Sequence, residues 1–463
     1  MFLNLNKKNP DKIAVIDDSG ESLTYGDLCK YAEEFASALP YRTLIFILSE
    51  NTNGSLLGYT SALSNRVVPL IISNKTEQTL FDSLYEKYQP EYLWLPTQRV
   101  DDFDSNFNEI VYTTHGYSLV KTSFKTPELY EELSLLLPTS GSTGSPKLVR
   151  HSYRNIEANA ENVMNLFELT SDERAMAVLP MHYTMGLSVI ASHLYAGATL
   201  LLCNKSLLDA GFWKMLKSGA TSFTGVPYSY ELLMKLRFTR MDLPNLKIIT
   251  QGGGKLKEEM WMHLANYAQE KGKKFIATYG QSECTARMAY LPAELALAKP
   301  CSIGIAEPGG KLSIVDAEGN ESFEGEAIGE MVYRGENVTL GYATCKDDLT
   351  KGDENHGVIH TGDIARRDGD GYYYIVGRMK RFLKIFGLRI GLDELENLIC
   401  SNFDTDCYCS GTDEKLIIKI TNSDVIDIIP MFIEEKTHLF HQRIEIIVID
   451  KIIRNEAGKV INQ

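Results

Sequence analysis

Residues 138–152 read PTSGSTGSPKLVRHS, with two glycines and a run of hydroxyl side chains ahead of one lysine, Lys147. Gly141 and Gly144 allow the backbone to turn tightly and to point N–H groups at a ligand. Lys147 adds a positive charge at the end of the loop. Further hydroxyl donors lie around the glycines: Ser140, Ser142 and Thr143. The segment therefore has the composition of a loop that wraps a polyphosphate.

The flanks of this loop predict a strand before it and a helix after it. ELSLLLP (132–138) is a short apolar run, and RHSYRNIEANAENVMNLF (150–167) has a helical period with Ser152 as its N-cap. Composition alone leaves a flexible surface linker as an alternative. A P-loop is disfavoured, because Leu148 follows the lysine where a P-loop needs Ser or Thr to reach Mg²⁺.

Apolar strand-like runs alternate with amphipathic runs through most of the first 300 residues, which predicts an α/β architecture. We expect helices over 23–39, with Thr24 as N-cap, and over 51–65, and buried strands over 43–49 and 67–73. Similar short apolar runs follow at 175–180, 198–203, 222–227, 246–254 and 273–280. Open α/β sheets place their ligands where such strands end in turns.

The character of the sequence changes after about residue 300. Short strand candidates separated by Gly and Asp turns predict a smaller β-rich section. The last stretch, 380–463, reads strand–helix–strand–helix–strand, with a helix at 392–400 and a strand at 443–450. The Gly377-Arg378 turn precedes a basic run, so we place a boundary between domains 1–378 and 379–463.

Bulk properties exclude several classes of protein. A chain of 463 residues predicts two or more domains, and a net charge of −14 argues against nucleic-acid binding. The apolar runs have the length of strands, too short to span a bilayer, and residues 1–15 lack the apolar core of a signal peptide. The eight cysteines show neither zinc nor CxxC spacing. We expect a reduced, cytoplasmic protein without a membrane span.

Several motifs together carry a family resemblance. TSGSTGSPK (139–147) resembles the phosphate-loop signature of the adenylate-forming superfamily, which comprises acyl-CoA synthetases, peptide-synthetase adenylation domains and luciferases. Four other stretches resemble further signatures of that family in the same order: QGGGKL (251–256), TYGQSEC (278–284), HTGDIARRDGDGYYYIVGR (360–378) and GRMKRFLKIFGLRIGLDELE (377–396). The resemblance spans nearly the whole chain. It implies a large N-terminal domain of α/β subdomains with mixed sheets and a small β-barrel-like part, and a small mobile α+β C-terminal domain.

The resemblance implies a site for ATP and Mg²⁺. Tyr279 would stack on adenine, Ser282 would contact phosphate and Glu283 would hold the metal, a hard cation that prefers oxygen ligands. Asp363 would accept hydrogen bonds from the ribose hydroxyls, and Arg378 would bind ribose or phosphate. The implied nucleotide-binding set is Thr139, Ser140, Gly141, Ser142, Thr143, Gly144, Lys147, Gly252, Gly253, Gly254, Thr278, Tyr279, Gly280, Asp363, Ile375 and Arg378.

The C-terminal part supplies the remaining implied roles. RNEAGKVINQ (454–463) resembles the last family signature and makes Lys459 the implied catalytic lysine, although the preceding Pro-Arg-Thr pattern is only partly present. Lys380 takes the hinge position, where the family usually has Asp and sometimes Lys. Gly387 falls where the family lines a pantetheine tunnel. A solvated basic face is an alternative reading of the charges at 380–389.

LPMHYTMGLSVIASHLYAGATLLL (179–202) resembles the helix that lines the acid pocket. The candidate pocket residues are His182, Tyr183, Gly186 and Val226, and an ordinary place in the core is an alternative for each. Tyr183 falls where many CoA ligases have His. The absence of Asp from 180–188 disfavours an α-amino acid as substrate.

The implied reaction has two halves. A small-molecule carboxylic acid attacks the α-phosphorus of ATP and releases pyrophosphate, and the thiol of CoA or of a phosphopantetheine carrier protein then takes the acyl group and releases AMP. Glu283, Ser282 and Lys459 would carry the first half, in which charge grows on phosphate oxygens. Two alternatives remain: an enzyme that only adenylates and passes its product to an amine or a carrier, and a non-catalytic adenylate-binding protein.

Overall fold

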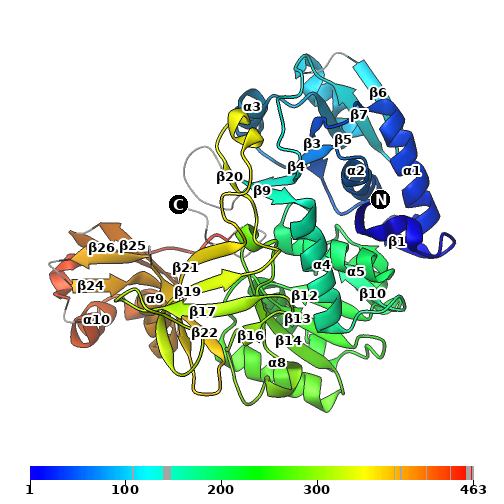
Figure 1. Ribbon diagram of the computed structural model, residues 1–463. Coiled ribbons are helices and arrows are strands. Elements are labelled where there is room, and N and C mark those ends of the chain that lie inside the picture. Colours follow the sequence, from blue (N-terminus) through cyan, green and yellow to red (C-terminus); the bar gives the residue numbers. More distant parts are fainter. Residues whose placement is uncertain are drawn as a thin grey trace. The chain divides into compact units, whose positions relative to one another are not determined.

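The computed structural model describes residues 1–106, 109–138, 147–379, 381–385, 388–412, 414–437, 439–454 and 460 (Figure 1). The chain divides into two compact units, Met1–Lys311 with Arg334–Ile359, and Leu312–Tyr333 with His360–Gln463. The boundary predicted at 378/379 falls inside the second unit and stays a prediction.

The first unit contains a nine-stranded mixed sheet whose central strands are parallel. In sheet order its strands are β16 (Ile305–Ala306), β15 (Ala289–Tyr290), β14 (Lys274–Tyr279), β13 (Ile248–Gln251), β12 (Ser222–Gly225), β10 (Arg174–Ala177), β11 (Thr199–Leu202), β1 (Ile13–Asp17) and β2 (Ser22–Thr24).

The same unit contains an eight-stranded mixed sheet. In sheet order its strands are β20 (Gly341–Ala343), β9 (Leu148–Ser152), β8 (Leu133–Pro138), β4 (Val68–Ser73), β3 (Leu44–Ser49), β5 (Tyr92–Pro96), β7 (Tyr117–Lys121) and β6 (Glu109–Thr114). The helices of this unit are α1 (Tyr25–Ala38), α2 (Asn53–Ser64), α3 (Gln78–Tyr88), α4 (Tyr153–Phe167), α5 (Thr184–Ala196), α6 (Ala210–Lys217), α7 (Pro227–Lys235) and α8 (Glu258–Glu270). The predicted α/β fold with mixed sheets is confirmed.

The two faces of the eight-stranded sheet bury different cores, because side chains alternate along a strand. On β3, Ile45 and Ile47 join a cluster that also contains buried residues of α1, α2, α4, α5 and of β10 and β11. Leu44, Phe46 and Leu48 join a second cluster with α3. The first cluster therefore ties the two sheets together through the helices between them.

Capping residues set the starts of two predicted helices. The Thr24 hydroxyl accepts the backbone N–H of Asp27, whose carboxylate accepts the N–H of Thr24, so α1 begins as expected. Ser152 and Asn155 form the same reciprocal pair at the start of α4. The helix therefore begins at Tyr153, after the predicted N-cap Ser152. Residues 148–152 before it pair with β8 as the buried strand β9, which was not predicted.

The second unit contains a five-stranded sheet and two smaller ones. The five strands, in sheet order, are β18 (Glu321–Ser322), β17 (Lys311–Val315), β19 (Ala327–Arg334), β21 (Val358–Arg367) and β22 (Tyr373–Arg378). The remainder comprises β23 (Phe382–Ile385), β24 (Leu388–Gly391), α9 (Leu392–Asn402), β25 (Cys407–Thr412), β26 (Lys415–Ile420), α10 (Ile429–Thr437) and β27 (Ile444–Val448). The helix predicted at 392–400 and the strand predicted at 443–450 correspond to α9 and β27.

The C-terminal elements have an apolar core of their own, with buried residues from Leu383 to Ile444. Across the part of the chain described above, none of the helices is long and apolar enough to cross a membrane.

Candidate active site

Three strand ends of the nine-stranded sheet bring predicted site residues to one edge. The parallel register aligns Gly225 of β12 with Gln251 of β13, and Gln251 with Ala277 of β14. Val226 and Gly252, which follow β12 and β13, are therefore neighbours of Thr278 near the end of β14. Carboxyl ends of parallel strands are the usual ligand-binding edge of an α/β sheet.

The glycine turn after β13 is closely packed. A Cβ at Gly252 would lie 2.8 Å from the Thr278 hydroxyl and 2.9 Å from the Met185 sulfur. Gly253 has a φ of +77°, and a Cβ there would lie 3.3 Å from the Val226 side chain. Only glycine fits these positions without displacing a neighbour. Gly254 completes the turn, and its carbonyl accepts a hydrogen bond from the Gln251 amide at 2.6 Å.

The turn after β14 presents Ser282 and Glu283 in a strained backbone. A Cβ at Gly280 would lie 1.4 Å from the carbonyl oxygen of Ala286, so the chain folds back on itself there. Thr285 and Ala286 both have positive φ, at 51° and 92°. Non-glycine residues rarely adopt such values, and they concentrate at functional sites.

The Asn337 side chain stabilises the turn after β14 through hydrogen bonds. Its buried amide donates to the carbonyls of Cys284 at 3.0 Å and Arg287 at 2.9 Å, and to the Glu307 carboxylate at 2.7 Å. The Thr285 hydroxyl donates back to the Asn337 carbonyl at 2.8 Å. Asn337 was not among the predicted site residues, because a single Asn in a β-rich stretch carries no local signal.

Two residues near the start of β20 fix Glu283. The backbone N–H and the hydroxyl of Thr339 both donate to the Glu283 carbonyl at 3.0 Å. The Tyr342 hydroxyl donates to the Glu283 carboxylate at 2.7 Å, and the ring of Tyr342 lies 5.5 Å from the Lys147 ammonium nitrogen. Burial and the charge of Glu283 raise the pKa of the Tyr342 phenol, so this phenol is a hydrogen-bond donor at neutral pH. Neither Thr339 nor Tyr342 belongs to a motif that pointed to this site.

The Glu283 carboxylate suits Mg²⁺. No group of three or more His, Cys, Asp or Glu side chains suited to a metal ion occurs among the residues that the structure describes. Mg²⁺ usually binds one or two carboxylates together with substrate phosphates and water, so a single carboxylate such as that of Glu283 is compatible with this ion.

Ser282 connects this turn to the helix α5. The Thr184 hydroxyl at the first position of α5 donates to the Ser282 hydroxyl at 2.8 Å. Gly186, two residues further, lets α5 approach the preceding loop, since a Cβ there would lie 2.3 Å from the Pro180 carbonyl oxygen. Tyr279 lies before the turn, and its hydroxyl accepts a hydrogen bond from Gln281 at 3.2 Å.

His182 precedes α5 and is neutral near pH 7. Burial lowers the pKa of its imidazole to about 4. Its Nδ1 atom is buried, and no hydrogen-bond partner for that atom is found within the described ranges. The ring lies 4.6 Å from that of Tyr183. A neutral imidazole can orient a substrate by a hydrogen bond but offers no charge to a carboxylate.

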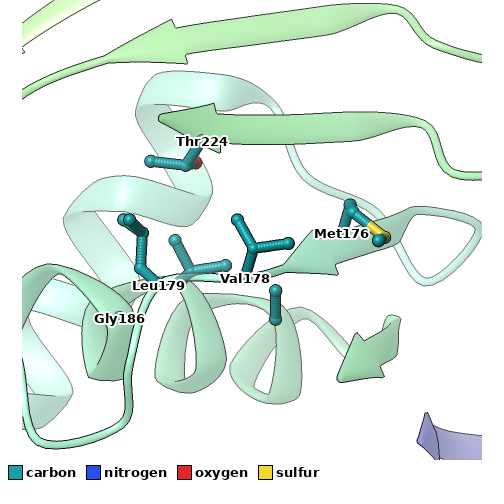
Figure 2. A pocket seen from close by; sticks show the side chains of 7 residues that line it. Met176, Val178, Leu179, Gly186 and Thr224 are labelled. Atoms are coloured by element: carbon teal, nitrogen blue, oxygen red, sulfur yellow. The ribbon is translucent and has the colours of Figure 1, made fainter. Parts of the chain in front are cut away.

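Figure 2 shows a small apolar hollow beside these elements. Its lining residues are Met176, Ala177, Val178, Leu179, Gly186, Val189 and Thr224. The space between the lining atoms is about 160 Å³, and this volume includes space that is open to solvent. The gaps within it are too narrow to admit a water molecule. This hollow is a gap in the packing, and of the four predicted acid-pocket residues it contains only Gly186.

In the second unit, the register of a hairpin explains the spacing between Asp363 and Arg378. Asp363 on β21 is the direct partner of Arg378 on β22, and Arg378 Nε lies 3.1 Å from a carboxylate oxygen of Asp363. Ile375 pairs with Ala365 on the same two strands. The two predicted ribose-binding residues are therefore adjacent.

Several predicted site residues lie outside the described residues and keep the standing of predictions. They are Thr139, Ser140, Gly141, Ser142, Thr143, Gly144, Lys380, Gly387 and Lys459.

Comparisons with known proteins agree with the resemblance. The sequence pattern described as "AMP-binding enzyme" matches residues 65–343. Indoleacetate–CoA ligase of Aromatoleum aromaticum is 32% identical over 57% of this chain and 51% of its own length. Oxalate–CoA ligase of Arabidopsis thaliana is 30% identical over 58% of this chain and 53% of its own length. The chain thus matches about half the length of these curated relatives.

Solved structures share the fold. O-succinylbenzoate coenzyme A synthetase from Bacillus subtilis, in complex with AMP, aligns with a TM-score of 0.79 and 19% identity over 99% of this chain and 96% of that one. MatB from Rhodopseudomonas palustris, bound to ATP, aligns with a TM-score of 0.78 and 20% identity over 99% and 97% of the two chains. Since the family pattern covers more than half of the sequence, the chain belongs to the AMP-binding enzyme family.

Proposed function

We propose that this chain is an AMP-forming acid–thiol ligase. A carboxylate oxygen of the acid forms a bond to the α-phosphorus of ATP, the bond from that phosphorus to the bridging oxygen breaks, and pyrophosphate leaves. A thiol then loses its proton to water, its sulfur forms a bond to the acyl carbon of the adenylate, and AMP leaves with the electrons of the broken C–O bond. The relatives named above are CoA ligases, which supports CoA as the thiol.

The single observation that carries this proposal is the placement of Glu283 on a strained turn. Thr339 fixes its backbone, Tyr342 its carboxylate, and Lys147 lies against the same Tyr342 ring. Glu283, the proposed metal ligand, and Lys147, the proposed phosphate contact, thus both lie next to Tyr342. When bound at Glu283, Mg²⁺ would neutralise charge on the phosphates.

The other residues of the edge have complementary proposed roles. Gly252 to Gly254 offer a flat surface to one face of adenine, and the Tyr279 ring stacks on its other face. Ser282 donates a hydrogen bond to a phosphate oxygen. Residues of the second unit have separate proposed roles: Asp363 and Arg378 bind the ribose, and Lys459 joins the incoming carboxylate to the α-phosphate. Lys380 is the proposed hinge and Gly387 lines the path of the thiol.

The acid and the compartment are also proposals. His182, Tyr183, Gly186 and Val226 would surround a carboxylic acid of modest polarity, and the hollow in Figure 2 would have to widen to contribute. The phosphopantetheine arm of a carrier protein is a second proposed acceptor, since it ends in the same thiol as CoA. The eight cysteines are free thiols, which is compatible with a reducing cytoplasm.

A pyrophosphate-release screen over carboxylic acids tests this function. Indoleacetate, oxalate, aryl propenoates and fatty acids, each with ATP and Mg²⁺, are incubated with and without CoA. We expect pyrophosphate release that depends on the acid, and AMP and acyl-CoA in equal amounts when CoA is present. ATP binding without pyrophosphate release for any acid would indicate a non-catalytic adenylate-binding protein. Transfer only to an amine or a carrier would replace CoA as acceptor.

A further inference from the structure

Tyr342 connects two groups of the proposed ATP site that are far apart in sequence. Its hydroxyl donates to one carboxylate oxygen of Glu283 at 2.7 Å, and the ammonium nitrogen of Lys147 lies 5.5 Å from its ring centre. The side chain thus contacts an anion through its edge and a cation through its face. An aromatic ring attracts a cation at its face, and a phenol donates at its rim.

The strand pairing explains why Lys147 and Tyr342 meet. β20 pairs antiparallel with β9, and Tyr342 lies directly opposite Val149. Because side chains alternate along a strand, Lys147 and Val149 are on the same face. Lys147 is therefore the diagonal neighbour of Tyr342, at the point where the phosphate-loop segment enters β9.

A buried arginine fixes the backbone that carries Tyr342. The Arg150 guanidinium donates to the carbonyls of Tyr342 at 3.1 Å and Leu340 at 2.9 Å, and forms an ion pair with Glu354 at 2.5 Å. Gly341 between them has a φ of +114°, and a Cβ there would lie 2.8 Å from the Glu354 carboxylate. The position of Tyr342 is thus set by the sheet and does not depend on its own side chain.

The side chain itself is not part of the apolar core. Tyr342 is 40% exposed, and it belongs to neither of the two clusters that join the sheets and helices of this unit. The core would not require a phenol at this position. Its hydroxyl instead restricts the rotation of the Glu283 carboxylate. The remaining lone pairs of that carboxylate stay available for another ligand.

We propose that Tyr342 is a positioning residue of the adenylation half-reaction, which sets the spacing between the carboxylate that holds Mg²⁺ and the lysine that contacts phosphate. This inference rests on the proposed function. It predicts an effect on adenylation but not on thiolysis, because the thiol attack on the finished adenylate no longer involves the β- and γ-phosphates. Groups that orient a metal ligand typically change metal affinity about 10-fold or more when they are removed.

The test compares Tyr342→Phe, which removes only the hydroxyl, with Tyr112→Phe as a matched control. Tyr112 also donates to a carboxylate at 2.7 Å, that of Glu34, on β6 away from the site. For each variant, Mn²⁺ binding in the presence of ATP is measured by electron paramagnetic resonance. The Mg²⁺ dependence of acid-dependent pyrophosphate exchange and the thiolysis of supplied acyl adenylate are measured in parallel.

We expect Tyr342→Phe to weaken Mn²⁺ binding and to raise the half-saturating Mg²⁺ concentration about 10-fold, with unchanged thiolysis and thermal midpoint. Tyr112→Phe should match the wild type in every assay. In a Glu283→Gln background the Tyr342→Phe change should have less than about a twofold effect, since its partner is gone. Wild-type Mn²⁺ binding in Tyr342→Phe, or an equal effect in both backgrounds, would overturn the proposal.

The Mn²⁺ measurement also separates this inference from the proposed function. If the wild type binds Mn²⁺ and ATP but exchanges no pyrophosphate with any acid, the proposed ligase activity fails while the role of Tyr342 in metal binding is still decided. Tyr342→Leu, which also removes the ring, should additionally weaken ATP binding without metal. Equal ATP binding by the Phe and Leu variants would remove Lys147 from the proposal.

Discussion

Asp363 and Arg378 face each other across the hairpin of β21 and β22, with Arg378 Nε 3.1 Å from a carboxylate oxygen of Asp363. The carboxylate is buried at 5% side-chain exposure, whereas Arg378 is 55% exposed. The pair therefore presents a fixed acceptor behind a movable cation. Such an arrangement suits a vicinal diol, whose two hydroxyls can donate to one carboxylate while the arginine contacts a neighbouring oxygen.

Arg378→Met should weaken AMP binding about 10-fold, the loss expected for one charge-assisted hydrogen bond. Its effect on unfolding should be within about 1 kcal/mol, because an ion pair with one exposed partner contributes little. Calorimetric titration with AMP measures the first quantity and urea unfolding the second. Lys415→Met, which breaks the exposed Lys415–Glu445 pair at 2.9 Å, is the control. AMP binding that Arg378→Met leaves unchanged would exclude Arg378 from the site.

Asn337→Ala should destabilise the protein by about 3 kcal/mol, because the buried Glu307 carboxylate and two backbone carbonyls lose a donor. The same change should lower the rate of pyrophosphate exchange, since the turn that carries Glu283 loses its support. Urea unfolding and exchange assays measure the two effects. The control is Asn266→Ala, which removes an exposed amide bonded to Met262 at 2.8 Å and should cost no more than about 0.5 kcal/mol.

A site residue can be predicted from the sequence when the residues it contacts lie close to it along the chain. Glu283 and Ser282 stand in a strand–turn motif, and the glycine turn at 252–254 follows an apolar strand, so each shows within a short window. Tyr342 and Asn337 act on Glu283 and its neighbours from 50 or more residues away. The place of Tyr342 follows from the pairing of β20 with β9, which a window of sequence does not contain.

The same reasoning explains why the strand β9 was not predicted. The sequence places the N-cap of α4 correctly at Ser152, but nothing in the composition of the residues before it indicates a strand. In the fold they extend the pairing with β8, where Arg150 and His151 are fully buried. Burial of Arg150 is possible only because carbonyls at 340 and 342 and the Glu354 carboxylate surround it. These partners come from the other end of the unit and are invisible in the local pattern.

Gly280→Ala should prevent the turn of 280–286 from forming, since the added Cβ would lie 1.4 Å from a backbone oxygen that cannot move alone. We expect a loss of about 3 kcal/mol or more in unfolding free energy, or a protein recovered only in insoluble form. Gly352→Ala is the matched control, because its Cβ would find the Tyr130 ring at 3.8 Å, an ordinary contact. Equal stability of the two variants would contradict the observed geometry of the turn.

Acidification should destabilise the folded protein through buried histidines. Burial lowers the pKa of His151 to about 3 and that of His193 to about 4, below the unfolded value of about 6.5. Between these values the unfolded chain binds a proton that the folded chain excludes, so stability is intact above pH 6.5 and is lost as pH falls toward 4. Urea unfolding at pH 7 and pH 5 should show a smaller difference in His151→Gln than in the wild type. His263→Gln, at an exposed position on α8, should show the wild-type difference.

Lys459→Ala should abolish acid-dependent pyrophosphate exchange and leave thiolysis of supplied acyl adenylate intact. The physical reason is that charge develops on the α-phosphate and the incoming carboxylate only in the first half, where a lysine between them is most stabilising. A rapid-quench assay on each half measures the two rates separately. Lys451→Ala, eight residues earlier in the chain, is the control for a general loss of positive charge. Equal loss of both half-reactions in Lys459→Ala would contradict a role confined to adenylation, and would assign Lys459 to a step that the two halves share.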